Sequence, residues 1–151
     1  MAGNGYNVFM GIIDMIAAAF PDGRPRDVRS LSPLALAYLG DTVYDLFVRA
    51  WLVRCTEHTP HDLHLLAAKR VCASGQAQAL AKIEPLLTQD ELAVCRRGRN
   101  AHSGSVPKNA SVADYHAATA LESLLGCLFI EGQDARITEL MTRILKEDFH
   151  G

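Results

Sequence analysis

The feature that most constrains this fold is a set of four helix-start signals along a chain without sustained alternation of polar and apolar residues. Each signal is a hydroxyl residue followed by a proline, or by an acid three residues later; the four are Ser32, Thr59, Thr88 and Ser111. A hydroxyl oxygen at this position accepts a hydrogen bond from the first helical turn, and proline suits the next position. Strands would require a two-residue alternation. The sequence therefore predicts an all-α helical bundle.

These signals and the apolar stretches between them divide the chain into expected helices. We expect helices over residues 6–20, 33–53, 60–87, 88–100, 111–130 and 133–148. Loops are expected over residues 21–27 and 101–110, each of which contains glycine and proline. Gly75 lies inside the third expected helix, where glycine is unfavourable. The sequence therefore leaves open whether that helix continues through Gly75.

Length and composition indicate one folded domain over residues 1–151. The chain has 151 residues, of which 49% are hydrophobic and 21% are charged. This balance excludes a disordered chain, and the length suits a single domain. The formal net charge is −2. Nucleic-acid binding must therefore rest on a local cluster of basic residues, because the overall charge does not indicate it.

The cysteines and the N-terminal segment indicate a cytoplasmic protein. Cys55, Cys72, Cys95 and Cys127 are scattered without a C-x-x-C pair, which excludes a zinc knuckle and predicts no disulfide framework. The apolar stretch "GIIDMIAAAF" contains Asp14 and lacks a preceding basic segment. It is too short to span a membrane and does not have the pattern of a signal peptide. We expect no membrane association.

An acid interrupts the apolar stretch "LALAYLGDTVYDLF", residues 34–47. Asp41, Asp45 and Arg49 follow at four-residue intervals, so they share one face of a helix whose other positions are mostly apolar. Such a helix is buried on most sides or shared with a partner chain. Gly40 precedes Asp41 and allows close approach of another helix or a ligand. The alternative is an exposed stripe in which Asp45 and Arg49 form an ion pair.

The stretch "HAATALESLLGCLFI", residues 116–130, repeats this pattern. Glu122 is its single acid, and Gly126 follows four residues later. If the two apolar helices pack together, Asp41 and Glu122 meet, and two carboxylates repel unless a proton or a cation neutralises them. Mg²⁺ suits such a site, because it takes oxygen ligands and needs one or two protein carboxylates. The alternative is that each acid forms a separate salt bridge.

A basic segment, "RRGRNAHSGSVPKN", lies between these two apolar stretches, at residues 96–109. The surrounding stretch from Leu92 to Ala113 contains no acid, and Gly98, Gly104 and Pro107 are expected to shape it as a loop. The candidate RNA-binding residues are Arg96, Arg97, Arg99, Asn100, Ser103, Lys108 and Asn109. These side chains suit phosphate contacts, and the lack of aromatic residues favours a duplex over a single strand. A plain solvated loop is the alternative.

A known family has the same three features in the same order along the chain: the stretch with the aspartate, the basic segment, and the stretch with the glutamate. The chain resembles Mini-ribonuclease III, the short bacterial enzymes that have the ribonuclease III catalytic domain without a double-stranded RNA-binding domain. The resemblance covers about residues 31–140, and its motifs are "LALAYLGDTVYDLFVR", "DLHLLAAKRVCASGQAQAL", "RRGRNAHSGSVPKN" and "TALESLLGCLFIEG". By position, Asp41 matches the signature aspartate, and Glu122 matches the second essential carboxylate. The stretch "RGRN", residues 97–100, with the loop after it matches the segment that contacts RNA in the family. Residues 1–30 lie outside the match.

The resemblance implies a ribonuclease III fold, a homodimer and Mg²⁺-dependent cleavage of double-stranded RNA, with Mn²⁺ as a substitute metal. It further implies maturation of the 23S ribosomal RNA precursor, products with a 5′-phosphate, and a ribosomal protein as a candidate for presenting the substrate. A catalytically silent, ribosome-associated RNA-binding protein of the same fold is the alternative function. Because such a protein would lose the two acids, the presence of Asp41 and Glu122 favours the enzyme.

The chain departs from the pattern of the longer ribonuclease III enzymes at three acidic positions. Their two glutamates before the signature aspartate are replaced here by Leu34 and Ala37, and a second aspartate is replaced by Thr119. Mini-ribonuclease III shares this reduction. Asp45 and Thr119 are therefore expected to support the two remaining carboxylates, and the number of bound metal ions stays open.

Overall fold

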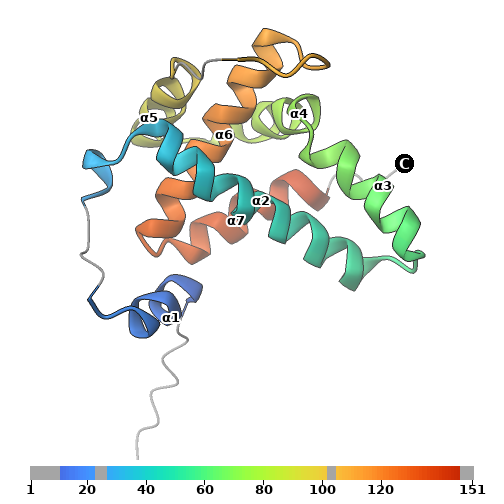
Figure 1. Ribbon diagram of the computed structural model, residues 1–151, viewed down its shortest axis with the longest axis horizontal. Helices are drawn as coiled ribbons and strands as arrows, with labels where there is room; N and C mark the ends of the chain where they lie inside the picture. Colours follow the sequence, from blue (N-terminus) through green and yellow to red (C-terminus); the bar gives the residue numbers. More distant parts are fainter. Residues whose placement is uncertain (1–10, 23–26, 102–104, 147–151) are drawn as a thin grey trace, which may run out of the picture.

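The computed structural model describes residues 11–22, 27–101 and 105–146, and within these ranges the chain is helical and contains no strand (Figure 1). The α-helices are α1 (Ile12–Ala19), α2 (Pro33–Cys55), α3 (Pro60–Val71), α4 (Ala73–Ile83), α5 (Gln89–Arg99), α6 (Val112–Ile130) and α7 (Asp134–Lys146). Two short 3-10 helices, η1 (Val28–Ser30) and η2 (Glu84–Leu86), complete the order. The all-α prediction is confirmed.

All four helix starts predicted from sequence are present. In each, the hydroxyl oxygen accepts a hydrogen bond from the backbone N–H three residues later, at 3.0–3.2 Å; the caps are Ser32, Thr59, Thr88 and Ser111. At α5 the exchange is reciprocal, because Glu91 Oε1 accepts from the Thr88 backbone N–H at 2.9 Å. These caps satisfy N–H groups that the helices leave without an internal partner.

The expected helix over residues 60–87 is not continuous. The backbone turns to an extended conformation at Cys72, with ψ 163°, so that α3 ends before Cys72 and α4 begins after it. Gly75 lies just beyond this break. A Cβ atom at Gly75 would collide with the carbonyl oxygens of Lys69 and Arg70. The glycine therefore allows the end of α3 to pack directly on the start of α4.

The ends of the chain agree with the sequence prediction where the structure describes them. Of the helix expected over residues 6–20, α1 covers Ile12 to Ala19, and residues 6–10 lie outside the described ranges. The last helix ends at Lys146, and residues 147 and 148 also lie outside. The long helix α2 extends two residues past its expected end, to Cys55.

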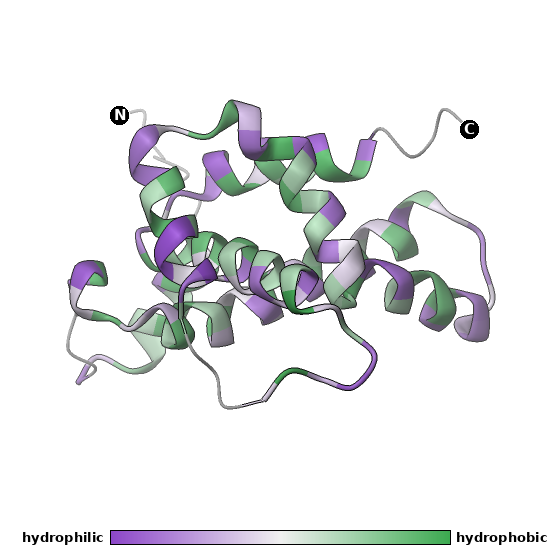
Figure 2. Ribbon diagram, turned by 90° about the horizontal axis from the view of Figure 1, so that it is seen from above, coloured by the Kyte–Doolittle hydropathy of each residue, from purple (hydrophilic) through white to green (hydrophobic). Residues whose placement is uncertain are grey.

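Helix α6 forms the centre of the bundle and packs against α2, α4, α5 and α7 (Figure 1). Eleven of its residues are buried, and Ala120, Leu121 and Leu125 are fully inaccessible. Along the ribbon, hydrophilic residues alternate with hydrophobic ones within the helices (Figure 2). Buried side chains from α2 through α7 join one hydrophobic core. Burying this apolar surface is the main favourable contribution to folding.

Two glycines allow α2 and α6 to cross in close contact. A Cβ at Gly40 would overlap the carbonyl oxygen of Glu122, and a Cβ at Gly126 would overlap that of Leu36. The hydroxyl of Ser123 donates to the Pro33 carbonyl at 2.9 Å and ties the start of α2 to α6. This crossing determines where the acids of the two helices lie.

Candidate active site

Asp41 of α2 and Glu122 of α6 line the same open cavity at the helix crossing. The cavity has a volume of about 530 Å³, and its walls come from α2, from the α3–α4 junction and from α6. Its lining includes Leu34, Ala37, Tyr38, Asp41, Thr42, Val71, Ala73, Gln76, Tyr115, Ala118, Thr119 and Glu122. The two acids meet because Gly40 lies directly against the backbone of Glu122. The shared acidic cavity expected from sequence is therefore present.

The electrostatics of this cavity disfavour two negative charges. Burial raises the pKa of Glu122 to about 7, the Gln76 amide opposes that rise, and the Asp41 carboxylate adds to it. Burial also raises the pKa of Asp41, and the nearby charge of Asp45 raises it further. Desolvation and like-charge repulsion both act against the ionised forms. A bound cation would reverse both effects, because it favours the charged carboxylates.

The donor set fits a hard divalent cation. The described residues hold no cluster of three or more histidine, cysteine or acidic side chains. Two carboxylates are enough for Mg²⁺, which keeps several waters and exchanges them for substrate phosphate oxygens. The cavity therefore offers Asp41 and Glu122 as ligands and leaves room for water and phosphate.

Gln76 is a site residue that the sequence did not indicate. Its side chain is buried, lines the cavity, and donates a hydrogen bond from Nε2 to Glu122 Oε1 at 3.0 Å. In the stretch "ASGQAQAL", Gln76 and Gln78 look alike, and both lie on a helix of small residues. Only the packing of α4 on α6 distinguishes them, because it turns Gln76 inward and leaves Gln78 exposed.

The two residues expected to support the site have local partners. Asp45 Oδ1 accepts from Arg49 Nε at 2.8 Å, and both side chains are exposed, so the ion pair considered as an alternative is present. Thr119 is buried and lines the cavity, and its hydroxyl donates back to the Tyr115 carbonyl at 3.0 Å. Within the described ranges, neither the Thr119 hydroxyl nor the Asp45 carboxylate hydrogen-bonds to Asp41 or Glu122.

The basic segment is not a single loop. Arg96, Arg97 and Arg99 belong to the last turn of α5, where positive charge suits the helix end. Gly98 is buried in that turn against α6, where a Cβ would lie 2.5 Å from the Ser123 hydroxyl oxygen. Its expected role as a loop former is therefore wrong, since it permits helix packing instead.

The structure distributes the candidate RNA-binding residues over more than one surface. Arg99 and Asn100 line a cavity with His116 of α6, whereas Arg97 lines a separate groove formed mainly by α5 and α6. Lys108 and Asn109 lie exposed in the following turn. Ser103 and Gly104 lie outside the residues that the structure describes. None of these described basic residues lines the cavity of Asp41 and Glu122.

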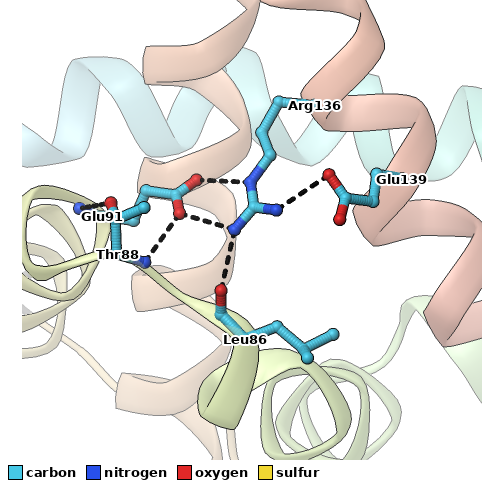
Figure 3. Close-up of polar contacts among 5 residues, drawn as sticks. All are labelled: Leu86, Thr88, Glu91, Arg136 and Glu139. Atoms are coloured by element: carbon cyan, nitrogen blue, oxygen red, sulfur yellow. Dashed lines mark hydrogen bonds and ion pairs between the residues drawn. The ribbon is translucent and has the colours of Figure 1, made fainter.

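A second polar cluster joins α5 to α7 (Figure 3). Arg136 donates from Nε and Nη2 to the two carboxylate oxygens of Glu91, at 2.9 and 2.8 Å. Its remaining donors reach Glu139 and the Leu86 carbonyl, each at 2.9 Å. The Arg136 guanidinium holds the pKa of the Glu91 carboxyl below its usual range. No local pattern in the sequence indicates this pair, because 45 residues separate its members.

Comparisons with known proteins agree with the fold and the motifs. The model of the Ribonuclease III domain family matches residues 34–133. A Mini-ribonuclease 3 of Brevibacillus brevis is 44% identical over 116 residues, which cover 77% of this chain and 87% of the relative. A Mini-ribonuclease 3 of Enterococcus faecalis is 41% identical over 125 residues, covering 81% and 94%.

A solved structure supports the same assignment. The X-ray structure of a Fusobacterium nucleatum protein superposes with a TM-score of 0.72 and 26% identity, over 82% of this chain and 98% of that one. An acidic cavity between two glycine-packed helices, within this helical fold, defines an endoribonuclease of the ribonuclease III class. The chain belongs to the Mini-ribonuclease 3 family within that class, as its similarity to several members over most of their length shows.

Proposed function

We propose that this endoribonuclease cleaves double-stranded RNA with Mg²⁺ bound by Asp41 and Glu122. One observation carries the proposal: the two carboxylates, from helices far apart in the sequence, line one cavity. Burial raises both of their pKa values, and a neighbouring carboxylate adds to each rise, Asp41 for Glu122 and Asp45 for Asp41. Such an arrangement is costly unless a cation offsets the charge. Perturbed acids in a cavity are also typical of catalytic sites.

The residues of the cavity have distinct tasks in this mechanism. Asp41 and Glu122 hold the cation, and Leu34, Ala37 and Ala118 form an apolar part of the cavity wall. When bound, Mg²⁺ supplies Lewis acidity that activates a water molecule and offsets the charge on the phosphate. The phosphodiester is hydrolysed to a 5′-phosphate and a 3′-hydroxyl, and Mn²⁺ can replace Mg²⁺ because it accepts the same oxygen ligands.

We further propose that the active form is a homodimer through α2. Leu34 and Tyr38 lie one turn apart on this helix, next to the cavity, with 37% and 86% of their surfaces exposed. Exposed apolar side chains at such a position favour a protein–protein contact. A two-fold contact through them would bring two acidic cavities together, one for each strand of a duplex.

The basic side chains near the end of α5 are proposed to hold the duplex by its phosphates. Arg96, Arg99 and Lys108 are exposed, and contacts of this kind make binding strongly salt-dependent. We propose the 23S ribosomal RNA precursor as the substrate, matured in the cytoplasm, with a ribosomal protein as a candidate for presenting it. In the described part of the chain, no helix is both long and apolar enough to cross a membrane.

Cleavage of a duplex RNA in Mg²⁺ tests the proposal. The wild type should cut a duplex from a 23S precursor end, whereas Asp41→Asn and Glu122→Gln should lose about a thousandfold or more of that activity. Asp62→Asn is the matched control, because Asp62 is an exposed acid near the start of α3. A wild type that binds the duplex without cutting it would instead indicate the catalytically silent function.

A further inference from the structure

Gln76 connects three helices through one buried amide. Its side chain, only 2% exposed, lies near the start of α4. Nε2 donates to the Val71 carbonyl at the end of α3, at 3.1 Å, and to Glu122 Oε1 on α6, at 3.0 Å. Gly75 permits this position, because a larger residue there would separate α3 from α4. The amide therefore links the helix break at Cys72 to the acidic cavity.

The chemistry of its two partners determines which way this amide points. A backbone carbonyl and an ionised carboxylate can only accept hydrogen bonds. Exchanging the two ends of the amide would place Gln76 Oε1 against both of them. In the orientation observed, Oε1 is buried without a hydrogen-bond partner in the described structure. An unpaired buried acceptor lowers stability, so the two hydrogen bonds of Nε2 are made at that cost.

The bond to Gln76 restricts the Glu122 carboxylate. Among the described residues, Gln76 is the single hydrogen-bond partner of the Glu122 side chain, and it donates to Oε1. The second oxygen, Oε2, stays available to a ligand of the cavity that Glu122 shares with Asp41. A carboxylate whose rotation is already restricted loses less conformational freedom when it binds a cation.

We propose that Gln76 is a positioning residue that holds the Glu122 carboxylate in the orientation required to bind a divalent cation together with Asp41. The inference rests on the proposed function, because it takes Asp41 and Glu122 as the cation ligands. Gln76 acts through Glu122 and needs no contact with the RNA or the reacting phosphate.

The test is direct binding of Mn²⁺ to the full chain without RNA, measured by calorimetry. Gln76→Met keeps an unbranched side chain of similar length and removes the donor, so its affinity for Mn²⁺ should fall about tenfold. Gln78→Met is the matched control, because Gln78 is exposed on the same helix and lines a different cavity. The Mn²⁺ affinity of Gln78→Met should stay at the wild-type value. An unchanged Mn²⁺ affinity in Gln76→Met would overturn the proposal.

A cleavage titration gives a second measurement that a merely structural role would not move. In Gln76→Met the Mg²⁺ concentration for half-maximal cleavage should rise about tenfold, and kcat at saturating Mg²⁺ should recover. A structural role alone would lower the unfolding free energy and leave both metal constants unchanged. If Gln76→Met does not fold, Gln76→Asn replaces it, because its amide is one methylene too short to reach both acceptors.

Asp41→Asn separates a failure of this inference from a failure of the proposed function. If the wild type binds Mn²⁺ no better than Asp41→Asn, the proposed metal site is wrong. If Asp41→Asn loses Mn²⁺ binding while Gln76→Met retains it fully, the metal site stands and the role of Gln76 is wrong. If both variants lose affinity and Gln78→Met does not, the positioning role is supported.

Discussion

The cavity of Asp41 and Glu122 and the cluster of Glu91 and Arg136 are both built from charged residues, but their electrostatics are opposite. Glu91 is 8% exposed, and its two oxygens are occupied by a guanidinium fork and a backbone N–H, which lowers its pKa. Glu122 has one neutral donor and a second acid nearby, and its pKa is raised.

The difference shows which of the two regions is built for stability. A buried charge whose hydrogen bonds are satisfied is destabilising only when its partner is lost, as for Glu91 of α5 and Arg136 of α7. A pair of like charges without a counterion lowers stability and is retained where a ligand supplies the missing charge. We therefore expect changes at the Glu91 cluster to affect folding, and changes at the acidic cavity to affect function. Four predictions test this comparison, from the largest effect to the smallest.

Arg136→Met should have the largest effect on stability. It leaves the buried Glu91 carboxylate without its cation, which should lower the unfolding free energy by about 3–5 kcal/mol. Denaturant unfolding measures the loss, with Arg54→Met at an exposed position as the control. The double variant Glu91→Met with Arg136→Met should recover much of it, because no unpaired charge remains. A loss below about 1 kcal/mol in Arg136→Met would contradict the assigned structural role.

Gly40→Ala should have the next largest effect, because the added methyl group meets the backbone of Glu122. Separating α2 from α6 should lower the unfolding free energy by about 3 kcal/mol and should also reduce cleavage, since the two carboxylates move apart. Gly126→Ala tests the same crossing from the other helix. If both variants keep wild-type stability and activity, close helix contact is not what forms the acidic cavity.

The pH dependence of stability should show the effect of Glu122. Its pKa is about 7 when folded, above its usual value of 4.5, so the folded state retains a proton that the unfolded state has lost. Without divalent cations, the unfolding free energy should therefore fall by about 2 kcal/mol as pH rises from about 4.5 to about 7. Glu122→Gln should remove this fall, and saturating Mg²⁺ should reduce it. Denaturant unfolding of the wild type and Glu122→Gln at pH 5 and pH 8, with EDTA or with Mg²⁺, measures the two effects.

Asp45→Asn should have the smallest effect. The ion pair of Asp45 with Arg49 is exposed, so its loss should lower the unfolding free energy by about 0.5 kcal/mol or less. Added salt should weaken the pair and reduce even this difference. Thermal unfolding of the wild type and of Asp45→Asn, at low and at high salt, measures this difference. A loss as large as that in Arg136→Met would remove the distinction between exposed and buried pairs in this protein.

The helices and their starting points could be predicted from the sequence, because the interactions that form them are local. Each cap joins residues three positions apart, so its donor and acceptor can both be recognised within a short stretch of sequence. The meeting of Asp41 and Glu122 could also be inferred, since each acid interrupts an apolar helix and has a glycine nearby. Packing two such helices at their glycines leaves few other arrangements.

The tertiary structure decided the features that depend on contacts between distant segments. Local sequence does not show that the chain turns at Cys72, that Gly98 packs into α6, or that Gln76 rather than Gln78 faces Glu122. The Glu91–Arg136 pair likewise forms only when α5 and α7 have both packed against α6. Helix caps and apolar periodicity are properties of a few neighbouring residues, whereas burial and hydrogen-bond partners are assigned only when the helices pack. The sequence by itself thus determined the helices and the pair of acids, and the tertiary structure decided which side chains surround that pair.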